Sequence, residues 1–235
     1  MYLYKNEDVG VDQFLEMINR AIVWPLGRNE VFSHATPEMI ALITRDVLKH
    51  YKAHSRSYHG AAHPYNQYIA LKLLLQKHQN LSGVNVSALI FMIVFHDAIM
   101  KHGMGADWNE RQSAEYASNV LSSLGAPQEL ESLVWAGVYA TYDHSLKEVP
   151  AHMHATVGLM LDFDLMGLGG SSESFAADTE SIWLEYQTRY SREEYDTGRK
   201  AWAAEFLTRE RVYHTPYYQQ LEIQALRNLS TLVEG

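Results

Sequence analysis

The stretch that decides the fold is Ala88-Leu89-Ile90-Phe91-Met92-Ile93-Val94-Phe95-His96-Asp97, an apolar run that ends in two polar residues. The run predicts a helix in the protein core, over residues 88–100. Neighbouring side chains on a helix point about 100° apart, so the pair His96-Asp97 is no ordinary packing choice. Both groups are costly to bury without partners, and a metal ion suits both. Together with the histidines at 59 and 63 and the aspartates at 162 and 164, the pair predicts a metal-dependent hydrolase.

Composition narrows the class of protein. A chain of 235 residues is long enough for one sizeable core and does not require two domains. Hydrophobic residues make up 47% and charged residues 20%, which is typical of soluble globular proteins. The net charge is −9 and the basic residues are scattered, so duplex DNA and acidic membrane surfaces are not expected partners. A small phosphorylated substrate stays possible, because a divalent cation supplies positive charge locally.

The chain contains no cysteine, which excludes disulfides, thiolate zinc sites and cysteine nucleophiles. Any metal must therefore use nitrogen and oxygen ligands. The first eight residues include Glu7 and Asp8 and are not apolar enough for a signal peptide. No apolar run approaches the roughly 18 residues that a membrane span needs. We expect a cytoplasmic protein.

Helical spacing of apolar residues covers most of the chain. It predicts helices over residues 11–24, 37–51, 64 to about 80, 88–100, 109–124, 128–142, 152–168, 174–190, 195–207 and 216–233. Pro25 is expected to end the first helix, and Thr36 with Pro37 to begin the second. No alternating strand pattern, repeat or linker is present. The sequence predicts a single all-α domain over residues 1–235.

Two further pairs carry the chemistry of a site. His59 and His63 would share a helix face, which suits two ligands of one ion or one ligand beside a proton donor. The alternative is a pair at a helix start, bonded to backbone carbonyls. Asp162 and Asp164 stand in an apolar segment, where carboxylates are costly unless paired or metal-bound. They cannot share a helix face, so we expect one at the ion and the other capping a helix or pairing with an arginine.

Other polar residues allow two interpretations each. Glu110 could join the site or simply favour the start of its helix, and His144 could contact a phosphate, bind a second metal or favour a helix end. His102 is expected to be solvated, and the remaining histidines carry no motif. The many aromatic residues of the last third of the chain could stack on bases. Core packing is the stronger expectation for them, because many fall at helical spacings.

Several stretches together suggest a family. They are Arg56-Ser57-Tyr58-His59-Gly60-Ala61-Ala62-His63, Phe95-His96-Asp97, Asn109-Glu110-Arg111-Gln112-Ser113-Ala114, Ala140-Thr141-Tyr142-Asp143-His144, Asp162-Phe163-Asp164-Leu165 and Gly198-Arg199. In this order they resemble the HD superfamily of metal-dependent phosphohydrolases, and within it the predicted HD phosphohydrolases of bacteria and phages. The resemblance covers residues 56–228 and implies an HD-domain-like helical bundle.

The resemblance also implies roles for individual residues. His63, His96, Asp97 and Asp164 would be the metal ligands, and Asp164 is preferred to Asp162 because Phe163-Asp164-Leu165 is similar to the family pattern. His59 is placed like the general-acid histidine of cyclic-nucleotide phosphodiesterases. The ion could be Mn, Fe, Co, Ni, Mg or Zn.

The expected reaction is hydrolysis of a phosphate ester, of a nucleotide or another small phosphorylated metabolite, by metal-activated water. Asp97 would orient or deprotonate the water and His59 would protonate the leaving group. Arg56, Lys101 or Arg199 could hold phosphate oxygens, or each could equally be a surface or helix-packing charge. Three alternatives remain: an HD-type di-iron oxygenase that adds Glu110 and His144 as ligands, a cyclic-nucleotide or oligonucleotide phosphodiesterase, and a binding module without catalysis.

Overall fold

The computed structural model describes residues 4–24, 32–53, 55–78 and 81–234, which form ten α-helices and no strand. The all-α prediction is therefore confirmed for these residues. None of their helices is long and apolar enough to cross a membrane. The helices are α1 (Val11–Val23), α3 (Pro37–Tyr51), α4 (Ala62–Lys77), α5 (Val86–Phe95), α6 (Trp108–Ser123), α7 (Gln128–Tyr139), α8 (His154–Asp164), α9 (Ser172–Tyr186), α10 (Arg192–Leu207) and α11 (Glu222–Glu234).

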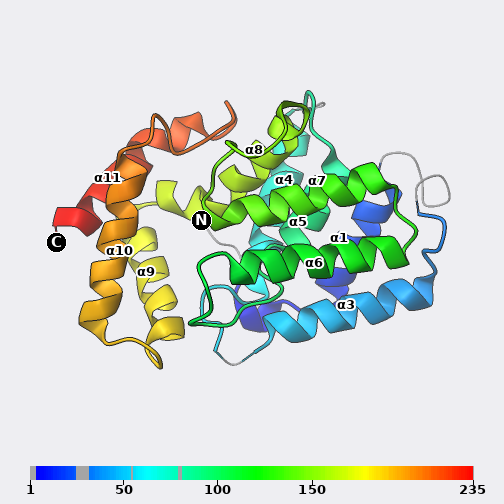
Figure 1. The fold of residues 1–235 in the computed structure, drawn as a ribbon, viewed down its shortest axis with the longest axis horizontal. Helices are drawn as coiled ribbons and strands as arrows, with labels where there is room; N and C mark the ends of the chain where they lie inside the picture. The colour runs from blue at the N-terminus through cyan, green and yellow to red at the C-terminus, as the bar shows by residue number, and fades with distance from the viewer. Residues whose placement is uncertain (1–3, 25–31, 54, 79–80, 235) are drawn as a thin grey trace.

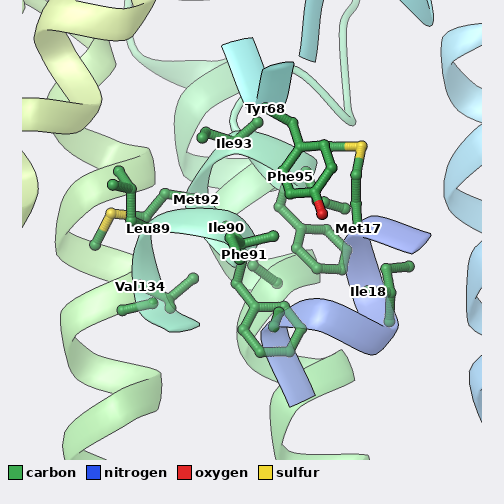
Figure 2. Close-up of a cluster of buried hydrophobic side chains, with 14 of the residues drawn as sticks. Met17, Ile18, Tyr68, Leu89, Ile90, Phe91, Met92, Ile93, Phe95 and Val134 are labelled. Carbon is green, nitrogen blue, oxygen red and sulfur yellow. The ribbon is translucent and has the colours of Figure 1, made fainter. Parts of the chain in front are cut away.

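Helix α5 is the centre of the larger bundle (Figure 1), and every one of its residues is buried. Its neighbours are α1, α4, α6, α7 and α8. Figure 2 shows Leu89 and Met92 on the side of Val134 of α7, and Phe95 on the side of Met17 of α1. Burying one such side chain contributes about 1.5–3 kcal/mol. The apolar run at 88–95 thus supplies the core from which the polar pair His96-Asp97 emerges.

Local sequence signals fix several helix starts as expected. The Thr36 hydroxyl accepts a hydrogen bond from the Met39 amide at 3.2 Å, with Pro37 as the first residue of α3. Asn85 caps α5 in the same way through the Ala88 amide. Pro25, which was expected to end the first helix, lies outside the described residues.

The predicted helix over residues 88–100 is wrong at its end, because α5 stops at Phe95. The backbone carbonyls of Asp97 and Ala98 accept hydrogen bonds from the Arg56 guanidinium. The Ser113 hydroxyl bonds both the amide and the carbonyl of Ile99. These partners outside the helix replace the helical hydrogen bonds and turn the chain, so that Asp97 lies in a turn and not on a helix.

The predicted helices over residues 128–142, 152–168 and 216–233 are also shorter than expected, because each contains a short 3₁₀ segment. These segments are Ala140–Tyr142, Ala151–Met153, Met166–Gly169 and Gln219–Leu221. As a result α8 ends at Asp164, and this residue stands at the end of a helix.

Helices α9, α10 and α11 lie together at one end of the molecule, beside the larger bundle (Figure 1). They share a second apolar cluster that includes Leu165 and Leu168 from the end of α8 and the turn after it. The Asn228 amide on α11 donates to the carbonyls of Leu168 and Gly170 at 2.7 and 2.9 Å. This attachment places α9 and α10 next to the polar end of α8.

Candidate metal centre

Four polar residues from three parts of the bundle meet at one point. His63 lies on α4, His96 and Asp97 follow α5, and Asp164 ends α8. Each offers one ligand atom, and these atoms all lie within 4.8 Å of one another. His96 Nε2 is 3.1 Å from Asp97 Oδ2 and 3.3 Å from Asp164 Oδ1, and His63 Nε2 is 3.2 Å from Asp164 Oδ1. The structure thus assembles the four residues that the resemblance implied as ligands.

The hydrogen bond of His96 determines which of its nitrogens can bind a metal. Its Nδ1 lies 3.0 Å from the carbonyl oxygen of Ile93. A carbonyl oxygen only accepts, so Nδ1 carries the hydrogen. In the neutral ring Nε2 is then left with a lone pair that faces Asp97 and Asp164. This is the arrangement of a metal-ligating histidine, whose other nitrogen is held by a backbone carbonyl.

The buried atoms fit a divalent cation. His96 Nε2 and Asp97 Oδ2 are buried and lack a hydrogen-bond partner among the described residues. The carboxylate oxygens of Asp97 and Asp164 face the lone pair of His96 Nε2, and all of these atoms are hydrogen-bond acceptors that repel one another. A cation between them removes this repulsion. Without an ion a proton must take its place: burial lowers the pKa of His96, but the charges of Asp97 and Asp164 outweigh it and raise the pKa well above its usual value. Two imidazoles and two carboxylates suit the transition-metal and magnesium ions named above.

His59 does not share a helix face with His63, contrary to the prediction, because it lies in the turn before α4 begins at Ala62. Its ring still packs 5.6 Å from that of His63. On its other side, Nδ1 lies 2.6 Å from Oε2 of Glu185, which is fully buried on α9. Oε1 of Glu185 accepts the backbone amides of Tyr58 and His59 at 2.7 and 2.8 Å. Sequence reasoning missed Glu185, whose only signal is an acidic residue within the apolar run 182–186.

The contact with Glu185 sets the protonation of His59. Nδ1 donates to the carboxylate, so Nε2 is the atom left to exchange a proton with a ligand in the adjoining cavity. Burial lowers the pKa of His59, but the carboxylate of Glu185, followed by that of Asp97, outweighs burial and raises the pKa. A histidine that is held in one tautomer and favours the protonated form is suited to act as a general acid.

Arg56 has a structural role instead of the expected contact with phosphate. Its buried guanidinium donates to the carbonyl oxygens of His59 at 3.2 Å, Asp97 at 2.6 Å and Ala98 at 3.0 Å. These bonds tie the turn that carries His59 to the turn that carries Asp97. Arg56 is therefore a positioning residue, and the interpretation of it as a phosphate ligand is corrected.

His144 and Glu110 stand at the edge of the four-residue cluster. His144 Nε2 is 3.0 Å from Asp164 Oδ2, and the residue has a positive φ of 50°. Glu110, in the first turn of α6, has a buried Oε2 without a hydrogen-bond partner. Burial, aided by the charge of Asp97, raises its pKa. Both residues face the site, yet among the described residues the group within 4.8 Å comprises the four candidate ligands alone.

Asp162 is not at the cluster, and it is neither a helix cap nor an arginine partner as expected. It is fully buried and accepts hydrogen bonds from the amides of His214 and Thr215 at 2.6 and 2.8 Å. Through this bond it holds the segment after α10 against α8. His214 Nε2 in turn lies 3.1 Å from the carbonyl oxygen of His144, so Asp162 helps to hold His144 in place through His214.

A cavity of about 530 Å³ adjoins the cluster, and His59, Glu110, His144 and Asp164 lie in its wall. Helices α9 and α10 and the turn between them form another part of its wall. The large aromatic residues of that wall are Phe175, Tyr186, Tyr190, Tyr195 and Trp202. The expectation that the aromatic residues of the last third serve core packing is thus incomplete, because these five also surround the cavity. His102, expected to be solvated, packs its ring 4.5 Å from Tyr186.

Comparison with known proteins gives no further guide to the site. No protein-family model, no curated protein and no solved structure matches this chain. The geometry and chemistry of the residues described above are therefore the only indication of what the site does.

Proposed function

We propose that this protein is a metal-dependent phosphohydrolase of the HD type, which cleaves a small phosphate ester with one divalent ion. The observation that carries the proposal is the bare, buried Nε2 of His96 beside Asp97 and Asp164. It is supported by a second histidine, His59, fixed by Glu185 at the wall of the same cavity. A site for a cation next to a proton donor is what hydrolysis of a phosphate ester requires.

When bound, the ion would lower the pKa of a water molecule and neutralise charge on the phosphate group. His63, His96, Asp97 and Asp164 would hold it. Asp97 is the ligand best placed to orient the attacking water, because 20% of its side chain is exposed while His96 is fully buried. The water oxygen would form the new bond to phosphorus, and Asp97 would take up the proton that the water loses.

His59 completes the reaction on the leaving side. As the bond between phosphorus and the ester oxygen breaks, Nε2 of His59 donates its proton to that oxygen, and an alcohol leaves. Glu185 keeps the ring in the correct tautomer and stabilises its protonated form. Arg56 holds the two turns at their mutual distance through the carbonyls of His59 and Asp97. We favour a nucleotide as substrate, because the cavity is larger than a phosphate group and has aromatic walls.

The alternative of a di-iron oxygenase needs a second set of metal ligands. Glu110 and His144 are the residues available, but only His144 contacts the cluster directly, through Asp164. The group of ligand atoms within 4.8 Å contains four described residues, which suits one ion. We therefore propose the phosphohydrolase with a single ion.

Phosphate release from a panel of nucleotides and simple phosphate esters tests the proposal, with Mn, Co or Mg added to metal-free protein. We expect activity that depends on the metal and falls by about 10²–10⁴-fold in His59→Asn. His152→Asn is the matched control, because His152 is exposed and lies in the short turn before α8. Equal activity of the two variants, or no release with any metal, contradicts the proposal.

A further inference from the structure

Arg199 is a cation in the cavity wall to which the mechanism above gives no role. It lies on α10, and its guanidinium stands 4.0 Å from the centre of the Trp202 ring. Its Nε is buried and has no hydrogen-bond partner among the described residues, and no described carboxylate forms an ion pair with it. Arg192 on the same helix differs, since it is exposed and bonded to Glu180 at 2.8 Å and Asp196 at 2.9 Å.

A half-buried cation without an ion-pair partner is costly, and burial accordingly lowers the pKa of Arg199. The side chains of Tyr195, Tyr58 and Tyr186 are the groups that act on this pKa in the opposite direction. They offer no charge to balance the guanidinium at neutral pH. The planar guanidinium fits the oxygens of a phosphate or carboxylate group, which would use the free Nε.

Tyr58 lies beside the metal centre and also acts on Arg199. Its ring is 4.8 Å from that of His59 and 5.1 Å from that of His63, and it is one of the tyrosines that influence the pKa of Arg199. Apart from Arg199 and the histidines, the charged residues of the cavity wall are the acids Glu110, Asp164, Asp178 and Glu194. An anionic group in the cavity is therefore attracted to the metal centre with the neighbouring His59, and to Arg199.

We propose that Arg199 binds a second anionic group of the substrate, a phosphate or a carboxylate, while the phosphate that is cleaved lies at the metal centre. The location of the cleaved phosphate rests on the proposed function, whereas the affinity of Arg199 for an anion does not. The substrate class is then a phosphate ester that carries a second anion on its organic part. That organic part spans the cavity of about 530 Å³ and contacts Tyr58 and Tyr186.

Anion binding by metal-free protein tests the first half of the inference. Inorganic phosphate and malonate are titrated separately into protein kept in EDTA, and the heat of binding is measured. We expect at least one anion to bind, and Arg199→Met to weaken it by about tenfold or more. Arg199→Lys should restore part of the affinity, and Arg192→Met should bind as the wild type does. The preferred anion identifies the second group as phosphate or carboxylate. Equal affinity of wild type and Arg199→Met overturns the proposal.

Steady-state kinetics of metal-loaded protein test the second half with two esters that differ by one anionic group. If the second group is a phosphate, the pair is adenosine 5′-monophosphate and adenosine 3′,5′-bisphosphate. If it is a carboxylate, the pair is glycerol 2-phosphate and 2-phosphoglycerate. In Arg199→Met we expect the KM of the ester that carries a second anionic group to rise by about tenfold. The KM of the ester that carries only the cleaved phosphate should change little. An equal loss for both esters means that Arg199 acts on the cleaved phosphate, and overturns the proposal. If no ester is cleaved, the proposed function fails, and the titration in EDTA still decides whether Arg199 binds an anion.

Discussion

The contact between Glu185 and His59 leads to a graded prediction for stability. In Glu185→Ala three hydrogen bonds to a fully buried carboxylate are lost, those from the Tyr58 amide, the His59 amide and His59 Nδ1. Breaking a buried charged pair by removing one partner costs about 3–5 kcal/mol. In Glu185→Gln the amide oxygen still accepts the two backbone amides, but the amide NH2 group faces Nδ1 of His59, so the charge and the hydrogen bond from Nδ1 are lost. We expect this variant to lose about 1.5–3 kcal/mol, the range for a charge-assisted hydrogen bond.

The loss in Glu185→Gln depends on pH in a definite direction. Burial raises the pKa of Glu185, but the charge of His59 outweighs it and lowers the pKa. Its contribution is therefore present above its usual pKa, about 4.3, and is lost as pH falls through the folded value. The pKa of His59 is raised, so its contribution is complete below about 6.5 and is lost as pH rises through the folded value. The difference between wild type and variant should be largest between these limits.

Urea unfolding of metal-free wild type and both variants at pH 5.5 and pH 9 measures these differences. All other titrating groups are common to the three proteins, so the difference reports on the pair. We expect Glu185→Ala to be less stable than Glu185→Gln at both pH values. The stability that Glu185→Gln loses relative to wild type should be smaller at pH 9 than at pH 5.5. If Glu185→Gln loses less than about 0.5 kcal/mol of stability at pH 5.5, the size typical of an exposed substitution, the charged pair of Glu185 and His59 does not stabilise the fold.

Two further predictions concern helix glycines and a buried carboxyl. In Gly137→Ala the new Cβ collides with the Met92 side chain, and urea unfolding should show a free energy of unfolding lower by about 1–3 kcal/mol. In Gly198→Ala the new Cβ meets no atom within 4 Å, and the free energy of unfolding should rise by about 0.5–1 kcal/mol. Burial raises the pKa of Asp178 to about 6, so its ionisation destabilises the fold as pH rises from 4 to 6. Asp178→Asn should therefore be more stable than wild type at pH 8 by about 1 kcal/mol, after allowance for partial exposure, and the gain should vanish at pH 4.

The sequence predicted those parts of the fold that depend on neighbours along the chain. The apolar run before His96 predicted the central helix, and Thr36 with Pro37 predicted the start of α3. The end of α5 was not predictable in this way. It depends on the guanidinium of Arg56, 41 positions from Asp97, and on the Ser113 hydroxyl. Helix ends that depend on such distant hydrogen bonds leave no local pattern.

The candidate site shows the same division. His63, His96, Asp97 and Asp164 were named from spacing and resemblance, and the structure brings them together. Glu185 was missed because its partner His59 is 126 positions away. Arg56 and Asp162 were given roles that suit their charge, but distant backbone groups use that charge instead. A sequence pattern indicates which residue types are costly to bury, while the partner that offsets the cost depends on the tertiary structure.

The metal content of the purified protein is the most direct test of the proposed metal site. Elemental analysis after reconstitution with Mn, Fe, Co, Ni or Zn and removal of free ions should find one divalent ion per chain in the wild type. Asp164→Asn should lose the ion, because Asp164 is one of the four proposed ligands. Asp143→Asn should retain it, because Asp143 is exposed and bonds only the Ser145 amide among the described residues. If no ion binds with any of these metals, or if the two variants have equal metal content, the four residues do not form the proposed metal site.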